Sequence, residues 1–323
     1  MPVLHSEFSP PFRYRNAHIQ SVFPSLFRKI SKVHYIRQRV NTSDNDFLDL
    51  DWSYAHTEGV DASLAVLCHG LEGCSERVYM LGMAQTFNRS GIDAVSYNFR
   101  GCSGEPNLHK KFYTAGSTDD LHDVLTSIIT QGQYSAIYLV GFSLGANLVL
   151  KYAGEKGRNI HPDIKGVAAI SAPCDLRSSA IELGKVTNRP YTKRFLKLLS
   201  EKIREKSTRY PDLRSINLNS IRTLKKFDDL VTAPLSGYEN AEDYWYRASC
   251  IRVLQETAIP TLILNAADDP MLGPECYPYK EAQQNDNVFL EVPKWGGHVG
   301  FMYKPGDTEY WHERRTVEFL VNT

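Results

Sequence analysis

The residue of this chain with the clearest potential for chemistry is Ser143. It stands at the centre of the sequence Gly-Phe-Ser-Leu-Gly over residues 141–145, between the apolar run 136–140 and a helix-like stretch that starts at Ala146. A serine on a sharp strand-to-helix turn needs small residues two positions away on each side, where larger side chains would collide. The pattern predicts a nucleophile elbow, a turn that presents a reactive serine, although an ordinary glycine-rich connection has the same composition.

An acidic pair and a histidine follow this serine, each just beyond a strand-like run. Asp268 and Asp269 come after residues 260–265, and His298 comes after residues 287–292. The carboxyl ends of neighbouring parallel strands meet at one edge of a sheet, where ligands bind. Serine, then acid, then histidine is also the chain order of the α/β-hydrolase fold, so the three positions together favour catalysis over three unrelated loop residues.

The side-chain types fit a catalytic triad. A serine hydroxyl is a weak nucleophile until a base removes its proton, and His298 is the natural base because imidazole titrates near neutral pH. An aspartate would fix the histidine tautomer and stabilise the imidazolium that forms. We choose Asp269 as this acid because it directly precedes the Pro-Met-Leu run at 270–272, which resembles the run that often carries the acid in this fold. Its neighbour Asp268 stays open as an alternative.

Backbone N–H groups must also stabilise the oxyanion of a tetrahedral intermediate. In this fold one donor belongs to the residue after the nucleophile and the other to the loop after the third strand. Leu144 and Leu71 occupy those places, and the preceding His69-Gly70 allows a close approach of backbone to substrate. His69 and Arg100 are candidates for orienting a substrate, but we do not count them as catalytic. The chemistry requires no metal and no organic cofactor.

The composition limits the class of protein in which this chemistry would take place. The 323 residues include 37 basic and 37 acidic side chains, so the formal net charge is zero and no global field favours nucleic acid. Six cysteines show neither a CxxC pair nor metal-ligand spacing with histidine. The first residues lack a signal-peptide pattern, and no window approaches about 18 uninterrupted apolar residues. We therefore expect a cytoplasmic protein with reduced cysteines that acts on a small molecule.

Short apolar runs alternate with helical stretches along much of the chain. Alternation at this spacing predicts parallel βαβ units. The runs before this region predict an antiparallel hairpin at the edge of the sheet, because a polar turn separates them. The hairpin strands are expected at 33–40 and 47–54, the parallel strands at 64–68, 93–99, 136–140, 166–171, 261–265 and 287–292, and the helices at 76–88, 118–130 and 308–321.

The alternation fails between about residue 171 and residue 261. We expect a helical cap over residues 175–255, inserted into a single α/β-hydrolase domain that spans residues 1–323. Residues 192–206 carry an apolar helical face. Residues 185–209 hold nine basic and two acidic residues. A solvated helix face is the preferred explanation of this charge, and peripheral contact with a membrane surface stays open as the alternative.

Further segments form a recognisable set outside the triad. They are Asn16-Ala17-His18-Ile19-Gln20 with Phe23-Pro24, His69-Gly70-Leu71-Glu72-Gly73, residues 98–104, Phe227-Asp228-Asp229 with Gly237-Tyr238, residues 243–246, and residues 296–301. Across roughly residues 12–305 the chain resembles the YheT-like branch of the α/β-hydrolase superfamily, which is related to eukaryotic ABHD1/ABHD3-type hydrolases. The resemblance implies a serine hydrolase of carboxylic esters with Ser143, Asp269 and His298 as its triad.

Two points of the resemblance do not carry over directly. The eukaryotic members have an amino-terminal membrane anchor and act on lipid-like substrates, whereas this sequence shows no such segment, so a phospholipid substrate is not transferred. The residues do not explain the role of the signature formed by Asn16, His18 and Gln20. We expect it to be a structural arm against the edge of the sheet.

The expected activity is therefore that of an esterase for acyl-chain or lipid-like esters. Ser143 would form an acyl-enzyme, and His298 would activate the water that releases the acid. Two alternatives use the same residues, namely acyl transfer to an alcohol and a non-catalytic hydrolase-like protein that binds a ligand. Apolar positions such as Leu198 and Leu199 fit an acyl-chain pocket and ordinary packing equally well. The sequence leaves the natural substrate, its acyl length and the oligomeric state undetermined.

Overall fold

The sheet at the centre of the molecule is mostly parallel. A computed structural model describes residues 3–30, 33–55 and 62–322. Its strands are β1 (Val3–Leu4), β2 (Ile36–Asn41), β3 (Phe47–Ser53), β4 (Ser63–Cys68), β5 (Asp93–Asn98), β6 (Ala136–Phe142), β7 (Ile164–Ile170), β8 (Thr261–Leu264) and β9 (Val288–Glu291). They lie in the order β1-β9-β8-β7-β6-β4-β5-β3-β2. Among these strands β3 runs antiparallel to both of its neighbours, β5 and β2, and the other neighbouring pairs are parallel.

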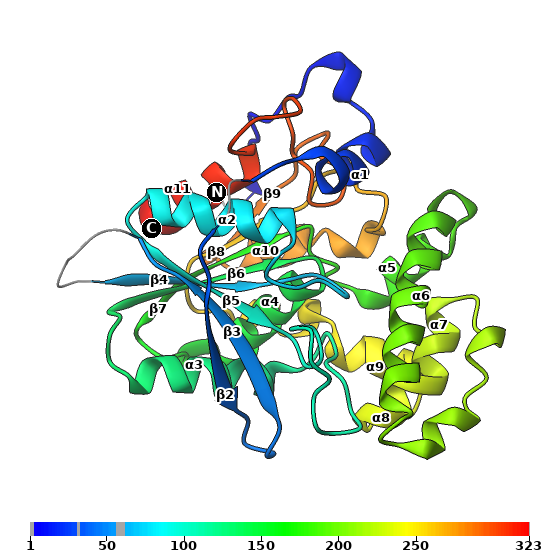
Figure 1. The fold of residues 1–323 in the computed structure, drawn as a ribbon. Coiled ribbons are helices and arrows are strands. Elements are labelled where there is room, and N and C mark those ends of the chain that lie inside the picture. Colours follow the sequence, from blue (N-terminus) through cyan, green and yellow to red (C-terminus); the bar gives the residue numbers. More distant parts are fainter. Residues whose placement is uncertain (1–2, 31–32, 56–61, 323) are drawn as a thin grey trace.

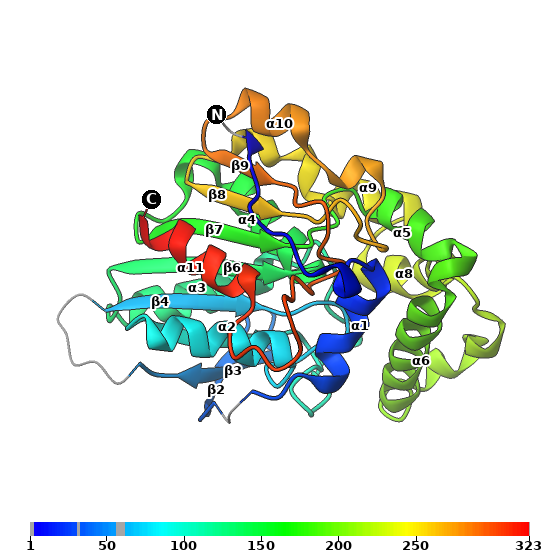
Figure 2. The same ribbon diagram turned by 90° about the horizontal axis from the view of Figure 1, so that it is seen from above.

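Helices cover both faces of this sheet (Figure 1). They are α1 (Ala17–Phe27), α2 (Val78–Arg89), α3 (Thr118–Thr130), α4 (Leu144–Lys156), α5 (Leu176–Gly184), α6 (Arg189–Lys206), α7 (Leu224–Phe227), α8 (Ala233–Ser236), α9 (Ala241–Ala248), α10 (Tyr279–Gln284) and α11 (Trp311–Asn322). One face packs against α2 and α11 and the other against α3, α4 and α10. Figure 2 shows α2 and α11 side by side over the first of these faces.

The central strands are almost entirely buried because both of their faces are covered. Every residue of β8 is buried, as is every residue of β7 except Lys165. Parallel sheets with helices on both faces have continuous apolar strands of this kind, whereas strands with one wet face alternate. The predicted fold class, a mostly parallel sheet flanked by helices, is therefore confirmed. The predicted hairpin is confirmed as well, because β2 and β3 pair antiparallel at one edge of the sheet.

Several element boundaries differ from those expected. The last helix was expected from residue 308 but begins at Trp311, where the Glu313 carboxylate accepts the N–H of Tyr310 and stabilises the start of the helix. Helix α6 begins at Arg189 and not at 192, with Pro190 in its first turn, a favoured place for proline. The short strand β1, which pairs with β9, was not expected.

Between β7 and β8 the chain forms helices α5 to α9, which we call the inserted helices. They lie together at one end of the sheet, at the right of Figure 1. A π-helical turn, Asp228–Thr232, interrupts them. They share a small apolar core to which Leu196, Ile203 and Phe227 belong. The structure thus has helices where the cap was expected, while a separate cap unit over residues 175–255 stays a prediction.

Candidate active site

Ser143 lies on the turn between β6 and α4. Its backbone has φ 53° and ψ −118°, values that residues with a side chain rarely adopt. The turn has room only for glycine at the two outer positions of the motif. A Cβ on Gly141 would collide with the backbone of Gly145, and a Cβ on Gly145 would collide with the backbone of Cys68 and His69. Strain of this kind persists where the surrounding structure fixes it, often at functional sites. The turn is therefore as sharp as the sequence pattern predicts.

The structure brings Ser143, His298 and Asp269 together. His298 Nε2 lies 2.9 Å from Ser143 Oγ, and His298 Nδ1 lies 2.9 Å from Asp269 Oδ2 and 3.1 Å from Oδ1. The Asp269 side chain is fully buried and that of His298 is 11% exposed. With Nδ1 donating to the carboxylate, Nε2 is free to accept the serine proton. The arrangement is that of a nucleophile, a base and a group that orients the base.

Asp268 points away from the imidazole. Its Oδ1 accepts the backbone N–H of Gly297 at 2.9 Å, and its Oδ2 has no hydrogen-bond partner among the described residues. Burial raises the pKa of the Asp268 carboxyl. Of the two adjacent acids, the geometry therefore places Asp269 next to the His298 imidazole. Asp268 instead binds the backbone of Gly297, the residue before His298.

Leu71 and Leu144, the predicted oxyanion donors, both lie near Ser143. Both line the cavity that Ser143 lines, and a Cβ on Gly70 would lie only 3.1 Å from the Cβ of Ser143. Leu144 is the first residue of α4, and the first N–H groups of a helix have no partner within it. These positions are compatible with the predicted oxyanion donors, whose function stays a prediction.

His69 and Arg100 serve the interior of the protein. The fully buried His69 ring contacts Gly70 O through Nδ1 at 2.7 Å and accepts the Phe99 N–H through Nε2, and burial lowers its pKa to about 3. The Arg100 guanidinium, also buried, forms ion pairs with Asp120 and Asp46. Neither residue is among those that line the two cavities beside Ser143. The structure therefore gives no support to a direct contact of either with substrate.

Two cavities meet at Ser143 and His298. The first, which we call the inner cavity, measures about 130 Å³ and is lined mainly by apolar residues of the inserted helices, such as Ala180, Leu199 and Leu235. The second, which we call the groove, measures about 550 Å³ and lies between α1, the start of α2 and α6. A substrate with two arms could therefore place its reacting atom beside the serine and one arm in each cavity.

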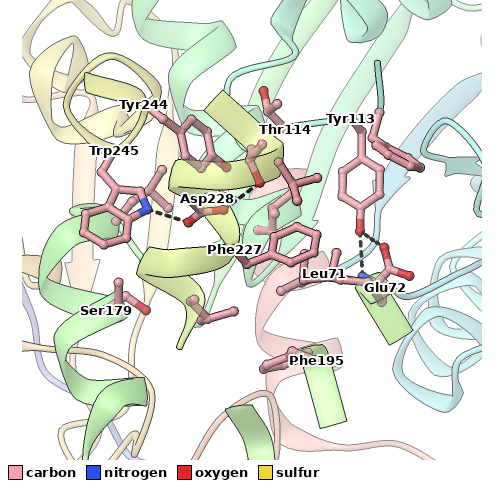
Figure 3. A pocket seen from close by; sticks show the side chains of 18 of the residues that line it. Leu71, Glu72, Tyr113, Thr114, Ser179, Phe195, Phe227, Asp228, Tyr244 and Trp245 are labelled. Carbon is pink, nitrogen blue, oxygen red and sulfur yellow. Dashed lines mark hydrogen bonds between the residues drawn. The ribbon is translucent and has the colours of Figure 1, made fainter. Parts of the chain in front are cut away.

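A half-buried carboxylate lies in the wall of the inner cavity, on the π-helical turn. Figure 3 shows Asp228 beside the indole of Trp245, whose Nε1 donates to Asp228 Oδ2 at 2.8 Å. Thr232 Oγ1 donates to the other oxygen at 2.6 Å. Burial raises the pKa of Asp228 to about 6. In the sequence, Asp228 stands out only as part of a family segment, because a single aspartate within a helical stretch gives no sign that it will face a cavity.

A second polar cluster lies on the other side of the same cavity. Glu72 accepts hydrogen bonds from Tyr113 Oη at 2.7 Å and Lys202 Nζ at 2.9 Å (Figure 3 shows the tyrosine contact). The backbone N–H of Glu72 also donates to Tyr113 Oη at 2.8 Å. The loop that carries Leu71 is thereby connected to α6 and to the segment before α3.

The amino-terminal signature lies beside the site. We expected a structural arm against the edge of the sheet, and this placement is wrong. Asn16 is the N-cap of α1, and its side chain accepts the N–H groups of His18 and Ile19 at 3.0 Å each. Gln20 is fully buried and binds the backbone of Met302, four residues after His298. The short strand β1, which precedes the signature, lies at one edge of the sheet.

Comparisons with known proteins agree with this architecture. A family model described as alpha/beta hydrolase fold matches residues 66–305. The putative esterase YheT of Escherichia coli (strain K12) is 33% identical over 98% of this chain and 93% of its own length. Phospholipase ABHD3 of Mus musculus is 27% identical over 93% of this chain and 74% of its own length. The esterase Pf2001 of Pyrococcus furiosus, 17% identical, has a similar fold with a TM-score of 0.61 over 91% of this chain and 95% of that one.

These matches define the class of protein. The chain belongs to the α/β hydrolase fold family, in the branch that contains YheT. The resemblance seen in the sequence is therefore confirmed. Within the described ranges, no helix is long and apolar enough to cross a membrane. The same residues contain no group of three or more histidine, cysteine, aspartate or glutamate side chains placed to hold a metal ion.

Proposed function

We propose that this protein is a serine hydrolase that cleaves carboxylic esters with Ser143, His298 and Asp269. The observation that carries the proposal is the continuous chain of hydrogen bonds from the buried Asp269 carboxylate through His298 to a serine on a strained turn. Membership of the α/β hydrolase fold family and the esterase and phospholipase names of its relatives support the same reaction class.

In the first step, Ser143 Oγ attacks the ester carbonyl carbon while His298 Nε2 takes the serine proton. The negative charge that develops on the carbonyl oxygen is stabilised by the N–H groups of Leu71 and Leu144. Asp269 keeps Nδ1 protonated and stabilises the imidazolium. Collapse of the intermediate breaks the bond to the alcohol oxygen, His298 returns the proton to that oxygen, and an acyl-enzyme remains on Ser143.

In the second step, water enters in place of the alcohol. His298 takes a proton from this water as it attacks the acyl carbon, and the same N–H groups stabilise the second oxyanion. Collapse of this second intermediate breaks the bond between the acyl carbon and Ser143 Oγ, His298 returns the proton to Oγ, and the acid leaves. Every proton is thus transferred through one imidazole whose two nitrogens are both held by hydrogen bonds. Apart from the ester and water, all the groups that take part in this cycle belong to the chain.

The two cavities assign the two halves of the ester. The inner cavity is lined mainly by apolar side chains such as Leu183, Leu199 and Leu235, so it suits the acyl chain. Its charged groups, Asp228, Glu72 and Lys202, are held by hydrogen bonds to neighbouring side chains. The groove is larger and carries charged residues such as Arg77 and Arg194, so it suits the alcohol half. The favoured substrates are therefore esters with an apolar acyl chain and a more polar alcohol.

Covalent labelling by a fluorophosphonate, detected by intact mass, tests the proposal. One probe molecule should add to the native chain, and labelling should vanish in Ser143→Ala and fall sharply in His298→Ala. Ser220→Ala, which removes an exposed serine of the inserted segment, should label like the native chain. An unlabelled native chain, next to a control hydrolase that reacts, would contradict the proposal and favour a ligand-binding protein.

Acyl transfer to an alcohol is separated from hydrolysis by its products. A fluorophosphonate would label a hydrolase and an acyltransferase alike, so labelling does not distinguish them. A p-nitrophenyl ester is therefore incubated with and without a short alcohol, and the products are identified by mass spectrometry. Free acid as the main product in both conditions supports a hydrolase. A new ester as the main product at low alcohol concentration would assign the protein as an acyltransferase.

A further inference from the structure

The loop that carries His298 has an unusual backbone. Within residues 296–302, which we call the His298 loop, Gly297, Val299 and Phe301 have positive φ values of 55°, 59° and 48°. This left-handed region is rare for residues with a side chain and is strained for a β-branched residue such as Val299. A loop in this conformation keeps its shape only where neighbouring groups fix it.

Two side chains of helix α1 hold the backbone of this loop. The Gln20 amide makes a pair of hydrogen bonds with Met302, since Oε1 accepts the Met302 N–H at 2.8 Å and Nε2 donates to the Met302 carbonyl at 2.9 Å. Ser21 Oγ accepts the N–H of His298 itself at 2.8 Å. Gln20 has no exposed surface, so no water competes for its amide.

The helix also lies directly against the loop. A Cβ on Gly297 would collide with the carbonyl oxygen of Ala17, and one on Gly300 with that of Gln20. Ser171 Oγ, on the residue that follows β7, accepts the Val299 N–H at 2.9 Å. The His298 loop is therefore held between the first turns of α1 and the end of β7.

Helix α1 is in turn anchored at both ends. His18 Nδ1 lies 2.9 Å from the hydroxyl of Tyr191, on α6. At the other end, Arg28 makes a bidentate ion pair with Glu313, at 2.5 and 2.7 Å, and both side chains are almost fully buried. The helix lies outside residues 66–305, the part of the chain that the family model covers. The part of the chain that the family model matches thus receives this support from a segment that precedes it.

We propose that Gln20 and Ser21 are positioning residues that set the catalytic imidazole of His298. The proposal rests on the proposed function, because it concerns the base of that reaction. Both ring contacts of His298 depend on where the loop backbone lies, so a shift of the loop loosens the bonds to Ser143 and Asp269 together. The Asn16, His18 and Gln20 signature then has a physical role: Asn16 starts the helix, His18 joins it to α6, and Gln20 holds the loop.

Gln20→Leu and Ser21→Ala test the proposal, since the first removes the amide at similar volume and the second removes the acceptor of the His298 N–H. We measure the fluorophosphonate labelling rate, kcat and KM with a short-chain ester, and confirm by circular dichroism that each variant is folded. Displacement of a reacting group by about 1 Å costs up to roughly 100-fold in rate, so kcat and the labelling rate should fall 10- to 100-fold with little change in KM. Ile19→Ala, on the exposed side of the same turn, should match the native chain.

The His298→Ala background distinguishes positioning from a general loss of structure. If Gln20 acts through the imidazole, Gln20→Leu causes no further loss of residual activity once the imidazole is gone, because the two effects are not additive. An equal loss in both backgrounds would overturn the proposal. So would a folded Gln20→Leu or Ser21→Ala that labels at the native rate. Failure of the native chain to label contradicts the proposed function instead, and Ser21→Ala carries the test if Gln20→Leu does not fold.

Discussion

The ammonium group of Lys202, on helix α6, lies 2.9 Å from the carboxylate of Glu72, on the loop that follows β4. Both side chains are largely buried, with 12% and 7% of their surfaces exposed. Glu72 follows Leu71, the expected oxyanion donor, and has a positive φ of 54°. A charge pair beside the proposed acyl cavity therefore connects the inserted helices to the loop that carries Leu71.

Breaking this pair should destabilise the protein strongly. Lys202→Met leaves the Glu72 carboxylate buried without its cation, and loss of one partner of a buried pair costs on the order of 3 kcal/mol in the free energy of unfolding. Urea denaturation measures the loss. The matched control is Lys193→Met, an exposed lysine of the same helix, which should change the stability by less than about 0.5 kcal/mol.

The double variant Glu72→Gln with Lys202→Met should recover part of the loss, because it no longer buries an unpaired charge. A single Lys202→Met variant as stable as the native chain would show that water or Tyr113 satisfies the carboxylate without the lysine. The ion pair between Lys202 and Glu72 would then make no measurable contribution to the free energy of unfolding.

The two adjacent aspartates should differ sharply in their effect on turnover. Asp269→Asn keeps the shape of the side chain but lets His298 adopt the wrong tautomer, so kcat for an ester at pH 7 should fall by about 10⁴-fold. Asp268→Asn keeps a carbonyl that can accept the Gly297 N–H, so kcat should fall less than about tenfold. The reverse order of effects would assign Asp268 as the acid of the triad.

Much of the fold could be predicted because its signals are local. The central strands are short apolar runs separated by helices, so their type and direction follow from composition and spacing. The glycines around Ser143 and the chain order of the acid and His298 indicated which residues would meet. Their meeting could be expected from the parallel sheet alone, because the carboxyl ends of its strands lie on one edge.

The remaining features depend on contacts between distant residues. Asp268 and Asp269 have the same chemistry and neighbouring positions, and only the loop backbone decides which carboxylate faces the imidazole. Gln20 binds a residue 282 positions away, and its buried amide is invisible to periodicity. Asp228 likewise lines the inner cavity because of how the inserted helices pack. The sequence predicts that these helices exist, but it does not predict how they pack against one another.

Asp228 should make stability depend on pH. Burial raises its pKa from 3.8 to about 6, so the folded protein holds this proton more tightly than the unfolded chain. Stability from this group is therefore greatest below about pH 4 and decreases as the pH rises to about 6, by on the order of 2 kcal/mol. The Asp228→Asn variant lacks the titrating carboxyl and so lacks this dependence. As the pH rises from about 4 to about 6, the native chain should lose on the order of 2 kcal/mol in unfolding free energy relative to the variant. A difference that stays constant from pH 4 to pH 7 would show that folding does not raise the pKa of Asp228.

Leu198 and Leu199 are consecutive residues of α6 that line different cavities. Leu199 lines the inner cavity and Leu198 lines the groove, so the two positions separate the acyl half of an ester from the alcohol half. Leu199→Trp fills part of the inner cavity and should lower kcat/KM for an octanoyl ester by roughly 10- to 100-fold, with little effect on the acetyl ester of the same alcohol.

Leu198→Trp provides the matched comparison, because it adds the same volume one residue away. It should leave the ratio of octanoyl to acetyl kcat/KM unchanged and instead discriminate between acetyl esters of small and large alcohols. The measurement is kcat/KM for four esters that combine two acyl lengths with two alcohol sizes, for the native chain and both variants. If Leu199→Trp selects on the alcohol and Leu198→Trp on the acyl chain, the ester binds in the opposite direction, with its acyl chain in the groove.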